Sequence, residues 1–236
     1  MNLNLNLNLN LKNINLFYFF LSFSLLCWKP CAAQSGPIEK YTFFLHNAFL
    51  ETNDLNAAHP DYGRVEYEEV LQKFRDNNFT VISEKRNGNV NAVAYAQRVN
   101  GQVDSLIGLG VNPGHVTIVG TSKGGYIAQY VSTIAHNREL NFVFVGSFRE
   151  TCLSCLGRQG DMEQLPDLNW CGNILNIYEK SDPAGNYAIS RKLASCCGIE
   201  QYKDVELNTG LRHGFLFKAM DEWIVPVMNW ANLNCE

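Results

Sequence analysis

The sequence predicts an α/β fold: a doubly wound, mostly parallel sheet of about six strands with helices on both faces. The first observation is that short apolar, β-branched runs alternate with helix-like segments between residues 41 and 230. The second is that one such run ends abruptly in a Gly-x-Ser-x-Gly-Gly turn, with a helix-like segment directly after it. The third is that polar or titratable residues follow several runs, where parallel sheets place their reactive groups. Together these observations predict one domain with a site at one edge of the sheet.

Each expected strand is a short strand-like run bounded by polar or turn-forming residues. In chain order the six strands are Tyr41–Leu45, Thr80–Ser83, Val116–Val119, Phe142–Val145, Ile174–Tyr178 and Tyr202–Leu207. The segments between and after them have helical patterns, and these are Tyr67–Asp76, Val90–Leu109, Gly125–Ala135, Asn186–Ser195 and Ala219–Trp230.

The first 33 residues are predicted to be a signal peptide, and residues 34–236 a single domain. An Asn-Leu repeat precedes the apolar run Leu16–Trp28, which is shorter than the roughly 20 residues that span a membrane. The small residues of Cys31-Ala32-Ala33 suit a signal peptidase that cleaves after Ala33. We therefore expect a secreted, extracellular protein, with an uncleaved membrane anchor as the alternative.

Charge and cysteine content narrow the classes of function. Cleavage would leave 17 of the 19 basic residues against 23 acidic ones, a net charge of −6, and no basic block indicates nucleic-acid binding. Six cysteines would remain, and their even number in a secreted chain indicates disulfide bonds rather than zinc or redox chemistry at Cys152-x-x-Cys155. They are Cys152, Cys155, Cys171, Cys196, Cys197 and Cys235. The glycosylation sequon that begins at Asn78 is expected to be exposed.

The turn between Val116–Val119 and the following helix has the pattern of a nucleophile elbow. Such a turn lifts the hydroxyl of its central serine, here Ser122, off the edge of the sheet. Side chains two positions before and after the serine would collide with backbone, and Gly120 and Gly124 have none. Ser122 is therefore the candidate nucleophile, the alternative being a glycine-rich turn with a chance serine.

With this elbow, residues 41–230 resemble the α/β-hydrolase superfamily, most closely its small, compact dienelactone-hydrolase-like and thioesterase-like members. The resemblance also rests on Asp182, which follows Ile174–Tyr178, and on His213, which lies in a Gly-flanked loop before the last helix. The order Ser, Asp, His is that of the superfamily. It implies that Asp182 orients the catalytic base His213, with Glu179 as the alternative acid.

The resemblance further implies an oxyanion hole made of two backbone N–H groups, those of Lys123 and Ala48. In the superfamily the loop after the first strand often begins His-Gly, whereas this chain has His46-Asn47. This departure matters because the loop can require a positive φ, which asparagine tolerates less readily than glycine. His46 is expected to be structural.

Two long segments are expected to shape the substrate site. Residues 49–66 include Tyr62 and Arg64, and residues 147–172 include three of the cysteines with Met162 and Trp170. Arg64, Arg86 and Lys123 could meet an acidic substrate group, but solvated surface charge is the favoured interpretation for each.

These observations predict a secreted serine hydrolase that cleaves a small-molecule carboxylic ester or thioester through an acyl-enzyme. We expect it to need no cofactor or metal, to bind no nucleic acid, and to leave the membrane once the signal peptide is cleaved. The alternative is a non-catalytic protein of the same fold that serves as a secreted binding or extracellular-matrix component. Asn47 is the residue that favours this alternative.

Overall fold

The computed structural model describes residues 38–147, 168–183 and 198–233. Outside these ranges lie the predicted signal peptide and the predicted helix Asn186–Ser195. Five of the six cysteines in residues 34–236 also lie outside them, and these are Cys152, Cys155, Cys196, Cys197 and Cys235. Within the described ranges, no helix has the length and apolar character needed to cross a bilayer.

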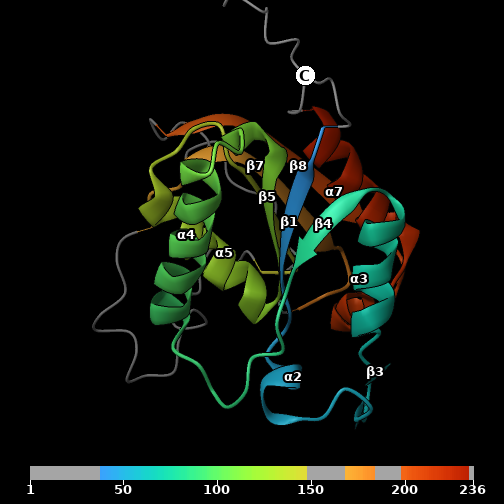
Figure 1. The fold of residues 1–236 in the computed structure, drawn as a ribbon. Helices are drawn as coiled ribbons and strands as arrows, with labels where there is room; N and C mark the ends of the chain where they lie inside the picture. The colour runs from blue at the N-terminus through green and yellow to red at the C-terminus, as the bar shows by residue number, and fades with distance from the viewer. Residues whose placement is uncertain (1–37, 148–167, 184–197, 234–236) are drawn as a thin grey trace, which may run out of the picture. The chain divides into compact units, whose positions relative to one another are not determined.

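Six parallel strands form one sheet in the order β4-β1-β5-β6-β7-β8 (Figure 1), which confirms the predicted fold class. The strands are β1 (Lys40–Leu45), β4 (Phe79–Ile82), β5 (Val116–Thr121), β6 (Asn141–Val145), β7 (Gly172–Glu179) and β8 (Ile199–Leu207). All pairings between them are parallel, so within the described ranges the sheet is more regular than "mostly parallel". Each predicted strand is present, with bounds that shift by a few residues.

Helices cover both faces of this sheet, as Figure 1 shows. On one face α3 (Tyr67–Asp76) and α7 (Asp221–Leu233) share a buried cluster with Phe44 and Val119. On the other face, α4 (Ala92–Gly108) and α5 (Lys123–Ala135) share a second buried cluster with the strand residues that lie next to Phe44 and Val119 in the sequence. Because successive strand residues point to opposite faces, each apolar run supplies both clusters.

The strand order reverses between β1 and β5, since β1 leads to β4 at the edge while β5 leads to β6 on the other side. In open parallel sheets, ligands bind in the crevice outside the carboxyl ends of the strands at such a reversal. The loop that starts at His46 and the turn at Ser122 both leave strands at this point. The topology therefore brings the two sequence-predicted segments together.

Residues 49–66, expected to be one irregular loop, contain two local structures. A short helix, α2 (Phe49–Thr52), follows the loop that starts at His46, and a hairpin of β2 (Ala58–His59) and β3 (Gly63–Arg64) comes next. Two-residue strands are too short to leave a periodic pattern in the sequence. The 3-10 helix η5 (Arg212–Phe217) was also not predicted.

Trp170 and Cys171 lie in the core and not at the substrate site, contrary to the expectation from sequence. The ring of Trp170 is 5.2 Å from that of Phe144, and both residues are buried. Cys171 is buried with a free thiol, so it takes no part in the predicted disulfide bonds. Burial raises the pKa of this thiol. Asn78 is exposed, as expected of its sequon.

Candidate active site

The turn at Ser122 has the strained backbone expected of a nucleophile elbow. Ser122 has φ 50° and ψ −117° and is the N-cap residue of α5. A Cβ atom at Gly120 would lie 2.1 Å from the carbonyl oxygen of Gly124, and a Cβ at Gly124 would lie 1.9 Å from that of Leu45. Both distances are far below van der Waals contact, so this turn requires glycine at both positions.

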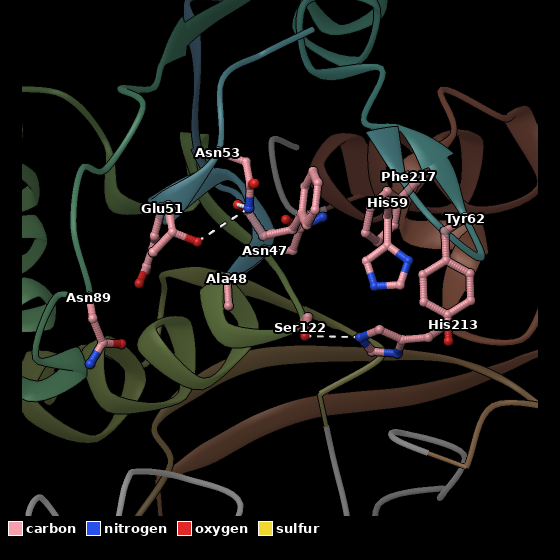
Figure 2. Close-up of a pocket in the computed structure, with 12 residues that line it drawn as sticks. Asn47, Ala48, Glu51, Asn53, His59, Tyr62, Asn89, Ser122, His213 and Phe217 are labelled. Carbon is pink, nitrogen blue, oxygen red and sulfur yellow. Dashed lines mark hydrogen bonds between the residues drawn. The ribbon is translucent and has the colours of Figure 1, made fainter. Parts of the chain in front are cut away.

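The structure brings Ser122, His213 and Asp182 together as one hydrogen-bonded series. The Oγ atom of Ser122 lies 3.0 Å from Nε2 of His213 (Figure 2), and Nδ1 of His213 lies 2.6 Å from Oδ2 of Asp182. Asp182 follows β7 and is fully buried, while His213 comes from η5, which follows β8. The buried carboxylate accepts a hydrogen bond from the Nδ1–H of His213, and this tautomer leaves Nε2 free to accept the serine proton.

Glu179, the alternative acid, holds the loops of the site together instead. Its carboxylate accepts hydrogen bonds from the backbone N–H and Oγ1 of Thr209, each at 2.8 Å, and from Oγ of Ser181 at 2.9 Å. Burial acts to raise the pKa of Glu179, but these hydrogen bonds outweigh it and lower the pKa. Glu179 thus joins the loop of Asp182 to the loop that precedes His213.

The two predicted oxyanion donors lie at helix N-termini. Ala48 is the N-cap residue of α2 and Lys123 is the first residue of α5. Backbone N–H groups at these positions have no partner within their own helix, and the helix dipole favours negative charge there. Ala48 and Ser122 line the same pocket.

Asn47 does not need the backbone freedom of glycine. In the described ranges the non-glycine residues with positive φ are Asn78, Ser122, His136 and Arg212, and Asn47 is not among them. The concern that its loop requires a positive φ was therefore wrong. The Asn47 side chain accepts a 3.4 Å hydrogen bond from the backbone N–H of Leu50, at the start of α2.

His46 is structural, as expected from the sequence. Its Nδ1 donates to the carbonyl oxygen of Asn47 at 2.7 Å, and its Nε2 accepts from the backbone N–H of Arg86 at 2.7 Å. Burial and the nearby charge of Arg86 lower the pKa of His46 to about 3. The imidazole is therefore neutral near pH 7, and both of its nitrogens form hydrogen bonds with backbone groups below the site.

A buried carboxylate, that of Glu51 on α2, binds two cations beside the site. Arg86 Nε lies 2.9 Å from Oε1 of Glu51, and Lys123 Nζ lies 2.6 Å from Oε2. Lys123 Nζ also donates to the carbonyl oxygen of Val90 at 2.8 Å. One carboxylate thus connects the helix capped by Ala48 with Lys123, the residue that supplies the other predicted oxyanion donor.

These contacts correct two expectations about surface charge. The Arg86 side chain is fully buried, and the Lys123 side chain is only 19% exposed. Arg64, in contrast, forms an exposed ion pair with Glu69, as a solvated charge would. Glu51 precedes residues 52–61, which are mostly polar, so the sequence indicates an exposed side chain there. For this reason no pattern in the sequence marks Glu51 as the buried partner of the two cations.

A pocket of about 390 Å³ opens above Ser122, and this volume suits a small molecule. Figure 2 shows two kinds of lining: Glu51, Asn53 and Asn89 lie on one side of Ser122, and aromatic side chains lie on the other, over His213. The sequence indicated only one member of this aromatic wall, Tyr62. The wall consists of Phe49, His59, Tyr62 and Phe217.

No family model matches the chain, and no curated protein matches its sequence. Several solved structures do match the chain in fold. SOBER1 of Arabidopsis thaliana is 13% identical over 84% of this chain and all of that chain, with a TM-score of 0.53. The ydeN gene product of B. subtilis is 10% identical over 82% and 99% of the two chains, with a TM-score of 0.54. An arylesterase is 15% identical over 83% and 76%, with a TM-score of 0.56. Together with the parallel sheet and its elbow, these similarities show that the chain has the α/β-hydrolase fold.

Proposed function

We propose that this protein is a serine hydrolase that cleaves a carboxylic ester or thioester of a small molecule. The observation that carries the proposal is the hydrogen-bonded series from Asp182 through His213 to Ser122, at the floor of a pocket of suitable volume. Strain at Ser122, where φ is 50°, is typical of a nucleophile held in position by its scaffold. One structure with the same fold is named an arylesterase, which agrees with this class of reaction.

Acylation begins when Ser122 Oγ attacks the carbonyl carbon of the substrate. His213 Nε2, 3.0 Å away, accepts the hydroxyl proton, and the Asp182 carboxylate stabilises the resulting imidazolium. The carbonyl oxygen becomes an oxyanion that accepts hydrogen bonds from the backbone N–H groups of Lys123 and Ala48. Removal of one such donor typically costs about 2.7–4 kcal/mol of transition-state stabilisation.

The tetrahedral intermediate then collapses to an acyl-enzyme. The bond to the alcohol or thiol breaks as His213 Nε2 returns its proton to the leaving oxygen or sulfur. In the second half of the reaction, water gives a proton to His213 and attacks the acyl carbon. Collapse of this second intermediate releases the acid and restores the proton of Ser122.

Hydrolysis of acetyl and butyryl esters and thioesters tests the proposal. We expect wild-type turnover that Ser122→Ala abolishes. Ser105→Ala is the matched control, because Ser105 is an exposed serine on α4 whose hydroxyl donates to the carbonyl oxygen of Gly101 in its own helix. Turnover that survives Ser122→Ala would refute the proposal. A folded wild-type protein that is inactive on all four substrates would instead favour a binding or extracellular-matrix protein.

We also propose that the hydrolase is secreted. The support is the sequence of residues 1–33, with its short apolar run and small residues before position 34. Of the cysteines in residues 34–236, the five outside the described ranges are proposed to be largely disulfide-bonded in the secreted protein. Five thiols cannot all pair with one another, so within one molecule at least one of them remains unpaired once Cys171 is free.

A further inference from the structure

We propose that the alcohol portion of the substrate is an aryl or other flat apolar group, bound against His59, Tyr62 and Phe217. The inference rests on the proposed ester hydrolysis and specifies the substrate class of that same site. Two observations carry it: the position of the aromatic wall relative to His213, and the rigidity with which the wall is built.

The chemistry of the reaction places the alcohol next to His213. His213 Nε2 must return its proton to the leaving oxygen, so this oxygen and the group attached to it face the imidazole. The ring of Tyr62 lies 6.4 Å from the ring of His213. Tyr62 also packs on the residue after the base, because a Cβ at Gly214 would lie 2.9 Å from Cδ1 of Tyr62. The surface that the leaving group meets is therefore aromatic.

The wall is a packed cluster rather than a set of separate side chains. His59 and Tyr62 stack with ring centroids 4.6 Å apart and planes 17° apart. Phe217 contacts both, with centroid distances of 5.6 Å to His59 and 5.3 Å to Tyr62. Phe49 closes the cluster at 5.5 Å from His59.

The backbone fixes this cluster to the catalytic elements. His59 pairs with Gly63 in the β2–β3 hairpin, whose turn carries Tyr62. Phe217 belongs to η5, the same short helix that carries His213. One member of the aromatic wall, Phe217, therefore shares an element with the base, and its ring contacts link the hairpin residues His59 and Tyr62 to that element.

The wall offers a further aromatic ring the geometry that such rings prefer. Aromatic pairs favour offset-stacked or edge-to-face arrangements at centroid distances of about 4.5–7 Å. His59 and Tyr62 are half-buried and line the pocket, so part of each ring faces the space above Ser122. Across the pocket the lining is polar, with Glu51, Asn53 and Asn89 (Figure 2). An apolar ring is therefore better placed on the His213 side.

Two isomeric esters test the placement: benzyl acetate has its ring on the alcohol, and methyl phenylacetate has its ring on the acyl group. Each kcat/KM is divided by the rate constant of hydroxide-catalysed hydrolysis of the same ester, which removes the difference in intrinsic reactivity. We expect the corrected ratio to favour benzyl acetate at least about tenfold, equivalent to about 1.4 kcal/mol.

Variants then assign the preference to the wall. Tyr62→Ala should lower the corrected ratio about tenfold, whereas Tyr62→Phe, which keeps the ring, should preserve it. Tyr202→Ala is the matched control, because Tyr202 is an exposed tyrosine on β8 that is not part of the pocket lining. The wild-type ratio needs no variant, so it decides the question even if Tyr62→Ala does not fold.

Three outcomes would overturn the inference. Ser122-dependent hydrolysis without preference for benzyl acetate would refute the placement and leave the proposed function intact. So would a Tyr62→Ala variant that loses activity equally on both isomers. Failure of both isomers and of the acetyl and butyryl esters and thioesters would refute the proposed function, and the inference with it.

Discussion

Glu51→Gln tests whether the buried carboxylate beside the site supports the fold and the chemistry together. The carboxylate of Glu51 is 2% exposed and pairs with Arg86, which is fully buried, and with Lys123, which is 19% exposed. Glutamine has nearly the same shape, but it is neutral, and its amide nitrogen would face a cation. The change therefore leaves a buried guanidinium without its counter-charge.

The cost follows from the burial of this pair. Removal of one partner of a buried ion pair costs about 3–5 kcal/mol because the remaining charge is uncompensated. For a domain of this size each kcal/mol lowers Tm by roughly 2–4 °C. We expect Tm to fall by roughly 6–20 °C. Activity should fall too, since Glu51 connects α2, whose N-cap residue is Ala48, with the side chain of Lys123.

Thermal unfolding followed by circular dichroism, with ester hydrolysis measured well below Tm, provides the assay. Glu200→Gln is the matched control, because Glu200 forms a 3.3 Å ion pair with Arg138 in which both side chains are more than half exposed. Exposed pairs contribute about 0–1 kcal/mol, so the control should shift Tm by only a few degrees. Equal shifts for Glu51→Gln and Glu200→Gln would refute the reasoning.

Three further predictions concern the base, acid stability and the leader. Asp182→Asn should lower kcat by roughly 10⁴-fold, because an amide does not favour the imidazole tautomer with its proton on Nδ1; a variant within tenfold of wild type would rule out this role. The pKa of His46 is about 3 when folded and about 6.5 when unfolded, so its contribution to stability is complete above pH 6.5 and is lost as pH falls toward 3. Urea unfolding should show about 2–3 kcal/mol of this loss at pH 4.5, and His46→Gln should lack it; an unchanged pH dependence in the variant would contradict the assignment. Amino-terminal sequencing of secreted protein should begin at Gln34, whereas a chain that retains Leu16–Trp28 would show an uncleaved anchor.

The fold was predictable because its strongest signals are local. The four inner strands, β1, β5, β6 and β7, are largely buried runs. The helix α3 was predicted with its observed bounds because an apolar stripe and a polar face alternate cleanly from Tyr67 to Asp76. The elbow was predictable for a steric reason, since the clashes at Gly120 and Gly124 leave glycine as the only fitting residue.

Other features depend on contacts between residues distant in sequence. Glu51 and Arg86 are 35 residues apart, and the pattern around Arg86 resembles a solvated loop, so its burial was not predicted. His59 and Phe217 meet only because β2–β3 and η5 pack together, and both elements are too short for a periodic signal. Trp170 was assigned to the substrate site because it lies in a long segment, whereas its ring packs in the core on Phe144.

The central claim is that Ser122 is a nucleophile activated by His213, and covalent labelling with a fluorophosphonate probe tests it most directly. Intact-mass spectrometry of the folded protein should show one adduct, and peptide mapping should place it on Ser122. The adduct should be absent in Ser122→Ala and form far more slowly in His213→Ala. A wild-type protein that remains unlabelled, or an adduct that maps to another residue, would contradict the account.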